Sequence, residues 1–366
     1  MTPRVERISC VIGSLGPGGA ERVLTTMANW WVNHGRGVTI YTLQASAPFF
    51  WLDERVTVVA LGLCGGGVVR RTIGAARRVV RLRRALLDGK PDVVVSFIDV
   101  ANVHALLAAI DGVVPVVISE RTDPRHHQIG TVWRMLRRMT YPTAAQLVLQ
   151  SAEVAATFSY MSASTRIIPN PVLPAPIPAS RPAPDVDVVA MGRFTREKGF
   201  DLLLKALQAV SLARGATTLR VWGDGPEKSA LMLLAHELGI ANQVEFPGNT
   251  TTPTTALQSG KVFVLPSRYE GFPNVLGEAM AVGLPSIAFD TSSGPRQLIR
   301  HGIDGILVHG QDVNALAAGI VQLLDDPDLR DRMEIEAPRV TARFGLASIM
   351  ARWDDVLDDA VQAAGK

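Results

Sequence analysis

Short apolar runs alternate with longer segments of helical spacing along the first half of the chain. Runs of this length are typical of buried strands in a parallel sheet, with crossover helices between them. The runs span residues 7–12, 38–43, 56–60, 92–97, 114–119 and 147–150, and the segments of helical spacing span 23–31, 68–87, 102–109 and 132–139. The pattern predicts an α/β domain with a doubly wound parallel sheet.

The same alternation starts again after a proline-rich connector that runs from about residue 169 to residue 184. Proline stiffens a connector, and this composition marks a domain boundary. Beyond it, strands are predicted at 186–191, 219–222, 244–246, 262–265 and 286–289, and helices at 274–282 and 349–364. A chain of 366 residues can form two domains of ordinary size, which we place at 1–172 and 173–345.

The charge of the chain changes sign near the same boundary. Residues 1–170 hold 19 Lys and Arg against 11 Asp and Glu, a net charge of +8, whereas residues 171–366 hold 18 against 23, a net charge of −5. A basic first half indicates an anionic partner for that half. There is no uninterrupted run of 18 apolar residues and no signal-peptide core, and neither Cys10 nor Cys64 has metal-ligand spacing, so we expect a cytoplasmic protein with reduced thiols.

The segment 262–289 combines a strand, a loop, a helix and a second strand, and it carries the clearest candidate chemistry. Its loop lies at the carboxyl end of a predicted parallel strand, where open α/β sheets bind ligands. Glu270 precedes the helix, and Glu278 lies just over one turn inside it. We expect the amides of residues 272–276 to point at an anion such as phosphate, while the two carboxylates accept hydrogen bonds from sugar hydroxyls. Two solvated surface acids are the alternative interpretation.

The frame around these acids, P-S-x-x-E-G-F-P-N-V-x-x-E-A-M-A-x-G-x-P from 266 to 285, resembles the signature of the retaining nucleotide-sugar glycosyltransferases of family 4. The resemblance implies the GT-B fold, in which two Rossmann-like domains face each other across a cleft. Domain 1–172 would then bind the acceptor and domain 173–345 the donor, with segment 346–366 packing back on the first domain. Glu270 is expected to bind the donor sugar hydroxyls, and Glu278 the ribose.

Residues 192–199, G-R-F-T-R-E-K-G, resemble the family's G-R-x-x-x-x-K-G element, whose Arg and Lys bind the donor diphosphate. Arg193 and Lys198 would stabilise the charge that the leaving diphosphate gains. The G-G-A-E-R loop at 18–22 resembles a loop in a subset of the family that includes bacterial enzymes of lipid-linked glycan synthesis. Simple tight turns are the alternative at 13–19, 223–226 and 247–249. The remaining donor contacts are expected at Gly18, Gly19, Gly223, Asp224, Gly248, Asn249, Gly271, Phe272, Pro273, Asn274, Val275 and Leu276.

The helix predicted at 68–87 has a basic stripe within about 60° of arc. The opposite side is apolar and includes Val80 and Leu87, and only Arg83 intrudes there. A surface helix packed on the sheet is one interpretation. The other is a contact with anionic lipid head groups or with the diphosphate of a polyprenyl acceptor, whereas nucleic acid is disfavoured because no aromatic residues interleave with the basic ones. The stripe consists of Arg70, Arg77, Arg81 and Arg84.

Glu120 follows the strand predicted at 114–119, and it therefore lies in a loop at the same edge of the sheet. Many proteins that this chain resembles carry a histidine near this position that hydrogen-bonds the donor sugar. We expect Glu120 to take that place and to act with Glu270, Arg193 and Lys198 as a catalytic residue. The adjacent His126 and His127 are expected to be solvated, because two successive residues face different ways.

These resemblances imply a hexosyltransferase that moves a sugar from a nucleoside-diphosphate donor, with UDP favoured, to a polyprenyl-diphosphate-linked saccharide. No metal and no cofactor is expected, because Arg193, Lys198 and helix-end amides supply positive charge. We expect the protein to lie peripherally on the inner face of the cell membrane. A nucleotide-sugar 2-epimerase of the same fold and a non-enzymatic membrane-binding module are the alternatives. An oxidoreductase would need a G-x-G-x-x-G loop, and none of the glycine-rich loops fits it.

Overall fold

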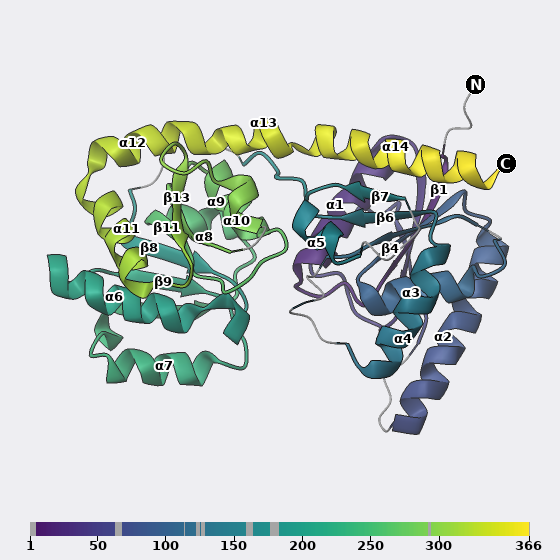
Figure 1. The fold of residues 1–366 in the computed structure, drawn as a ribbon, viewed down its shortest axis with the longest axis horizontal. Coiled ribbons are helices and arrows are strands. Elements are labelled where there is room, and N and C mark those ends of the chain that lie inside the picture. The colour runs from purple at the N-terminus through teal and green to yellow at the C-terminus, as the bar shows by residue number, and fades with distance from the viewer. Residues whose placement is uncertain are drawn as a thin grey trace. The chain divides into compact units, whose positions relative to one another are not determined.

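The computed structural model describes residues 5–62, 68–112, 114–121, 125, 129–158, 164–175, 183–291 and 294–365 (Figure 1). Within residues 68–73 it describes the backbone only. The chain divides into two compact units: unit 1 comprises Met1–Pro171 together with Ala347–Lys366, and unit 2 comprises Val172–Leu346. Cys64, His126 and His127 lie outside the described residues, as does the side chain of Arg70.

Unit 1 is built on a seven-stranded parallel sheet with the order β3-β2-β1-β4-β5-β6-β7. The central strands β1, β4, β5 and β6 are buried almost throughout, as strands covered on both faces must be. The connection from β1 runs toward one edge of the sheet and those from β3 onward run toward the other, so the sheet is doubly wound. The strands are β1 (Arg7–Ile12), β2 (Gly37–Thr42), β3 (Thr57–Ala60), β4 (Val93–Phe97), β5 (Val116–Ser119), β6 (Gln146–Leu149) and β7 (Thr165–Ile167).

Helices cover both faces of this sheet. Because parallel crossovers are right-handed, the opposite directions of winding place α1 on one face and α2, α3 and α4 on the other. Helix α3 packs between α2 and α4, and Figure 1 shows these three helices side by side. The helices of unit 1 are α1 (Gly19–Asn33), α2 (Val68–Gly89), α3 (Asp99–Ala108), α4 (Thr131–Thr140) and α5 (Ala152–Ala156), together with most of α14 (Leu346–Ala364).

Helix α14 belongs to the core of unit 1, although most of unit 2 separates it from the rest of unit 1 in the sequence. Trp353 is fully buried, and its ring lies 6.0 Å from that of Phe97 at the end of β4. Asp354 accepts a hydrogen bond from Nε1 of the buried Trp31 at 3.2 Å and pairs with Arg36 at 2.6 Å. The apolar side of the helix predicted at 349–364 therefore packs on the α1 face of the sheet.

Unit 2 is built on a six-stranded parallel sheet with the order β10-β9-β8-β11-β12-β13. Strands β8 and β11 are neighbours at the centre, and the direction of winding reverses between them. Open α/β sheets bind their ligands beside such a reversal. The strands are β8 (Val186–Met191), β9 (Leu219–Trp222), β10 (Val244–Gly248), β11 (Gly260–Leu265), β12 (Ser286–Asp290) and β13 (Gly305–His309).

Alternate residues of β8 and β11 point into two separate hydrophobic cores of unit 2. Val188 and Val262 pack with α6, α7, α11 and α12 on one face, whereas Val189 and Phe263 pack with α8 and α9 on the other. Two helices begin with an aspartate cap, Asp312 before α11 and Asp326 before α12. The helices are α6 (Phe200–Arg214), α7 (Lys228–Glu237), α8 (Pro253–Gln258), α9 (Asn274–Ala281), α10 (Gly294–Leu298), α11 (Val313–Asp325), α12 (Pro327–Glu336) and α13 (Val340–Phe344).

The predicted strands all form, with bounds that differ by at most two residues, whereas three predicted helices, those that correspond to α1, α3 and α14, start three or four residues too late. Helix α1 begins at Gly19, four residues before the predicted start. The glycine-rich segment supplies its first turn, because Gly18 is the N-cap residue and Glu21 at the third helical position folds back over it. A Cβ atom at Gly18 would lie 2.0 Å from the Glu21 carboxylate, so a larger residue there would require the Glu21 side chain to move.

Candidate functional site

The carboxyl edge of the unit 2 sheet, where its strands end, brings Lys198 and the first carboxylate of the predicted site into contact, and Arg193 lies in the same loop as Lys198. Arg193 and Lys198 follow β8, and Glu270 follows the neighbouring strand β11. Nζ of Lys198 lies 2.7 Å from Oε1 of Glu270, and the same oxygen accepts a hydrogen bond of 2.7 Å from Oγ of Ser267. The side chain of Glu270 is 10% exposed and that of Lys198 is 26% exposed, so the pair is accessible from one side only.

Two further interactions fix the loop that carries Lys198 against the loop that carries Glu270. Both guanidinium NH groups of Arg268 donate to the carboxylate of Asp201 at 2.7 Å, and the backbone N–H of Arg268 donates to the Glu197 carbonyl at 2.8 Å. Gly199 adopts φ +67°, and a Cβ atom there would lie 2.0 Å from the Pro266 carbonyl oxygen. The two loops therefore approach each other at backbone contact, which glycine alone permits.

The loops after β9 and β10 join the same arrangement. The N–H of Gly223 donates to the carbonyl of Gly248 at 2.8 Å, and the N–H of Phe194 donates to the carbonyl of Asp224 at 2.9 Å. Gly223 has φ +135° and lies against the Gly192 carbonyl, where a Cβ atom would be only 1.9 Å away. Four of the predicted turns thus meet at one edge through their backbones.

The entry into α9 differs from the prediction at two positions. Pro273 is the N-cap residue rather than the first residue of the helix, and it has no N–H to offer. The N–H of Leu276 donates to the Pro273 carbonyl at 3.0 Å. The prediction that the amides of residues 272–276 are all free to bind an anion is therefore wrong at these two residues. Pro273 has no N–H, and the N–H of Leu276 is used within the first turn of the helix. Glu278 lies half-buried on α9.

Gly294 at the start of α10 supports the same loop from a third strand connection. A Cβ atom at Gly294 would lie 2.7 Å from Cδ of Pro273 and 3.0 Å from Cβ of Glu270. The sequence reasoning assigned no role to this glycine or to Ser267. Ser267 is the serine of the P-S-x-x-E frame, so its position near Glu270 could have been inferred from the sequence. Only the fold brings Gly294 to Glu270.

In unit 1, Glu120 follows β5 at the carboxyl edge, as predicted, but it is only 2% exposed. The Tyr141 hydroxyl donates a hydrogen bond to Oε1 of Glu120 and accepts one from Nδ2 of Asn102 at 3.1 Å. Burial, and then the Glu120 carboxylate, raise the pKa of Tyr141 well above its ordinary value, so the phenol keeps its proton. The contact between Glu120 and a donor sugar stays a prediction.

Arg121 is a buried charged residue that the sequence reasoning did not single out. Its guanidinium lies 4.1 Å from the centre of the Phe97 ring and 5.6 Å from that of Trp353, and it donates to Oδ1 of Asn170. Burial lowers the pKa of Arg121 to about 9, so it remains charged at neutral pH. The guanidinium thus joins β5, helix α14 and the end of the first chain segment of unit 1.

Helix α2 presents the described part of the basic stripe to solvent, since Arg77, Arg81 and Arg84 are all exposed. These three arginines, with Ala76 and Val80, line a hollow of about 450 Å³. The predicted apolar side is wrong at Val80 and Leu87, which are 48% and 42% exposed. At 100° per residue they lie only about 40° and 60° from Arg84, and about 100° or more from the buried Leu86. Leu82 and Leu86 provide the buried contact.

Arg83 lies on the buried side of α2, and the structure explains why a charge is tolerated there. Its guanidinium donates to both carboxylate oxygens of Asp111 and to the carbonyl of Ala108, the last residue of α3. A cation at a helix C-terminus also meets the negative end of the helix dipole. Arg83 thus has a structural partner and does not belong to the basic stripe.

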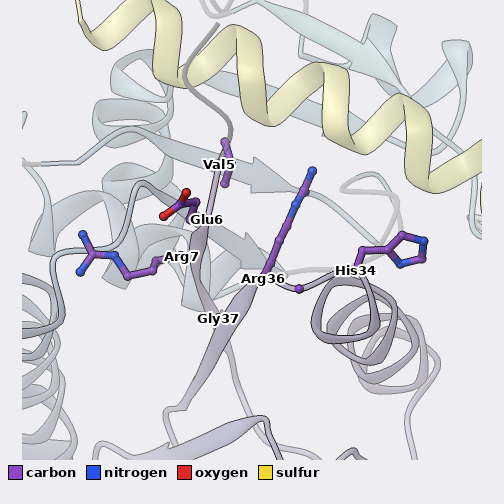
Figure 2. A pocket seen from close by; sticks show the side chains of 7 residues that line it. Val5, Glu6, Arg7, His34, Arg36 and Gly37 are labelled. Atoms are coloured by element: carbon purple, nitrogen blue, oxygen red, sulfur yellow. The ribbon is translucent and has the colours of Figure 1, made fainter. Parts of the chain in front are cut away.

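A second hollow, of about 510 Å³, lies at the opposite edge of the unit 1 sheet, where β1 and β2 begin. Figure 2 shows that Arg7, Arg36 and His34 point in different directions around it. Arg36 already pairs with Asp354. Side chains that diverge do not converge on one ligand, so this hollow is not a candidate active site.

Within the described residues, no three His, Cys, Asp or Glu side chains are grouped so that they could hold a metal ion. The same part of the chain contains no helix with the length and hydropathy to span a membrane. The expectation that the protein needs no metal and no cofactor stays a prediction that rests on the resemblance.

Comparisons with known proteins agree with this architecture. A model described as Glycosyltransferase Family 4 matches residues 17–175, and one described as Glycosyl transferases group 1 matches residues 178–340. LpsD of Rhizobium meliloti, named a lipopolysaccharide core biosynthesis glycosyltransferase, is 31% identical over 354 residues, which cover 94% of this chain and 96% of that protein.

A Campylobacter jejuni protein is 27% identical over 351 residues, which cover 95% of this chain and 97% of that protein. It is named GalNAc-alpha-(1->4)-GalNAc-alpha-(1->3)-diNAcBac-PP-undecaprenol alpha-1,4-N-acetyl-D-galactosaminyltransferase. The structure of Anabaena HepE in complex with UDP matches with a TM-score of 0.76 at 20% identity, and the match covers 96% of this chain and 99% of that one.

Proposed function

The chain belongs to the family 4 glycosyltransferases and has the GT-B fold, and on that premise we propose the reaction that it catalyses. It transfers a sugar from a nucleoside diphosphate to a hydroxyl of a polyprenyl-diphosphate-linked saccharide, with retention at the anomeric carbon. The coarser activity, glycosyl transfer in bacterial glycan synthesis, is common to the relatives. The donor, the acceptor and the stereochemistry are the proposed part.

The contact between Lys198 and Glu270 carries the donor half of the proposal. A cation and a carboxylate lie 2.7 Å apart at the reversal point of a parallel sheet, and Arg193 is exposed in the loop that carries Lys198. A diphosphate placed there would take positive charge from Lys198 and Arg193, while Glu270 would accept hydrogen bonds from sugar hydroxyls. The glycine contacts keep the loops at a fixed distance, so the positive charge is in place before the leaving group gains its negative charge.

UDP is the proposed nucleotide because it is the usual donor nucleotide of the enzymes that the G-G-A-E-R loop resembles, with GDP-mannose as the other candidate. The fold accommodates UDP in Anabaena HepE. In the proposed step the bond from the anomeric carbon to the donor diphosphate breaks, and the acceptor oxygen bonds to the same face of the sugar. The leaving diphosphate takes the proton of the acceptor hydroxyl, so that step needs no protein base.

The hollow on α2 supports the acceptor half of the proposal. Three exposed arginines within two helical turns would bind the diphosphate of a lipid-linked saccharide. The Campylobacter relative is named for an acceptor of this chemistry, an undecaprenol diphosphate that carries sugars. Arg81 also donates to the Leu61 carbonyl at 2.9 Å, which holds its side chain in place.

The test is a transfer assay with a panel of UDP-sugars and GDP-mannose, each with and without a polyprenyl-diphosphate-linked saccharide. We expect one donor to be consumed only with the lipid-linked acceptor, and nuclear magnetic resonance of the product should show the anomeric configuration of the donor. A product with the inverted anomeric configuration would contradict the proposed retaining mechanism. Epimerised donor in the acceptor-free reaction would instead favour the 2-epimerase.

A further inference from the structure

The outward half of α4 is divided into an apolar strip and a basic strip. Val132, Met135 and Met139 are 60%, 58% and 65% exposed, and at 100° per residue they fall within about 60° of one another. Arg134 and Arg138 are exposed next to them, about 40° apart. We call these five residues the α4 surface. Single exposed apolar residues are common, but three in one row beside two arginines form a patterned surface.

Packing on the inner half of α4 fixes which residues face outward. Leu136 and Trp133 pack against the core of unit 1, and the Trp133 ring stacks on that of His104 in α3 at 5.2 Å. The guanidinium of Arg137 lies over the Phe158 ring at 5.8 Å. Rotating the helix to bury the methionines would expose Trp133 and Leu136, so the apolar strip stays outside.

We propose that the α4 surface docks the enzyme on an anionic lipid bilayer. The apolar strip would enter the boundary between head groups and acyl chains, while the arginines extend sideways to lipid phosphates. Helix α4 contains three arginines and no acid, and α2, which flanks the other side of α3, adds exposed arginines to the same layer. The inference deepens the proposed function and rests on it, because a lipid-linked acceptor places the reaction at a bilayer.

A second copy of the chain is the competing occupant, and charge disfavours it. In a twofold dimer the same patch meets itself, so two α4 surfaces would bring their arginines together with no acid on either helix. An anionic bilayer instead supplies a negative counter-charge along the whole strip. Charge complementarity therefore selects the bilayer.

The test is sedimentation of the full chain with vesicles of phosphatidylglycerol and phosphatidylcholine in equal amounts, compared with pure phosphatidylcholine. We expect binding to the anionic vesicles, with a partition coefficient that falls about tenfold or more in Met135→Asp/Met139→Asp. Each of Arg134→Gln and Arg138→Gln should lower it about fivefold on anionic vesicles only. Met135→Leu should bind as the wild type does, and Met232→Asp, at a 53% exposed methionine of unit 2, is the matched control.

Equal binding by the wild type and the double aspartate variant would overturn the proposal, as would absence of wild-type binding. A wild type that is dimeric in solution and becomes monomeric in Met135→Asp would assign the surface to a second copy instead. The vesicles contain neither donor nor acceptor, so this result is independent of the transfer assay. If vesicles bind and no sugar nucleotide is consumed, the proposed reaction fails while the docking surface stands.

Discussion

The carboxyl edges of the two sheets hold their charged residues in different ways. In unit 2, Lys198 and Glu270 lie on short loops and stay partly accessible, and glycines set the distance between those loops. In unit 1, Glu120 and Arg121 are 2% and 9% exposed, and they are held by tyrosine, asparagine and aromatic rings from distant segments. The backbone at Ile98 on that edge has φ +73°, a strained value for a β-branched residue.

If the proposed function holds, the difference separates residues that take part in the reaction from residues that stabilise the fold. A side chain that must reach a ligand and then release it has to be accessible, and its position must come from the backbone that carries it. A buried charge needs several partners and is costly to disturb. We therefore expect substitutions at the unit 2 edge to lower activity more than stability, and substitutions at the unit 1 edge to lower stability first.

The largest expected effect is the loss of transfer in Lys198→Ala. Without the ammonium group the leaving diphosphate loses a fixed cation, and the barrier should rise by roughly 2–4 kcal/mol. Steady-state kcat/KM should fall by about two to three orders of magnitude, while the denaturation midpoint in urea moves little. Lys205→Ala, at an exposed lysine of α6, is the control. Unchanged turnover in Lys198→Ala would remove the basis of the donor site.

The next effect concerns the glycine that lets the two unit 2 loops touch. In Gly199→Ala the new Cβ atom would lie 2.0 Å from the Pro266 carbonyl oxygen, so the loops must separate. We expect the free energy of unfolding to fall by about 3 kcal/mol or more. Gly302→Ala is the matched control, because Gly302 has φ +77° but no atom within 4 Å of the position of a Cβ.

The control variant should lose only the cost of a left-handed alanine, about 1–2 kcal/mol. Urea unfolding of both variants measures the difference. Equal losses would mean that backbone conformation alone, and not the contact with the Pro266 carbonyl, makes glycine necessary at position 199. The close approach of the loops would then have no part in holding Lys198 beside Glu270.

A smaller effect is expected at the unit 1 edge in Tyr141→Phe. The substitution removes the hydroxyl that donates to Glu120 and accepts from Asn102, and it leaves two buried polar groups short of a partner. The free energy of unfolding should fall by about 1–3 kcal/mol. Tyr269→Phe, at a more exposed tyrosine of unit 2, should change it by less. If Tyr141→Phe is as stable as the wild type but has reduced turnover, Glu120 has a catalytic rather than a structural role.

The smallest effect is the pH dependence that Asp201 contributes. Burial acts to raise its pKa, but the hydrogen bonds and the charge of Arg268 outweigh burial and lower it below its ordinary value. A lowered carboxyl pKa adds stability that is complete above the unfolded pKa of about 3.9 and is lost as the pH falls through the folded value. The pair is partly exposed, so the contribution should stay within about 1 kcal/mol.

Urea unfolding of wild type and Asp201→Asn from about pH 7 down to about pH 3 measures this contribution. The difference between the two proteins should shrink as the solution becomes more acidic. A difference that grows toward low pH would have the wrong sign for a carboxylate stabilised by Arg268. Kinetics of the same variant at neutral pH would show whether the ion pair also positions Lys198.

Much of the fold could be predicted from the sequence, because buried parallel strands are rich in apolar residues. The central strands β4, β8 and β11 contain apolar runs at 93–95, 188–191 and 262–265, and their bounds differ from the prediction by no more than two residues. Strand β7 is exposed along its length and was not predicted. Val80 and Leu87 were assigned to the wrong side of α2, since at 100° per residue both lie close to Arg84 rather than opposite it.

The sequence by itself determined most of the strands, the turns that carry Arg193, Lys198 and Glu270, and the basic stripe of α2. These features depend on neighbours a few residues apart, and local sterics and periodicity encode them. Only the tertiary structure decided that Lys198 meets Glu270 at 2.7 Å, that Glu120 is buried under Tyr141, and that the apolar strip of α4 faces outward. Each of these features depends on how separate helices and strands pack against one another. The spacing of residues along one segment carries no information about that packing.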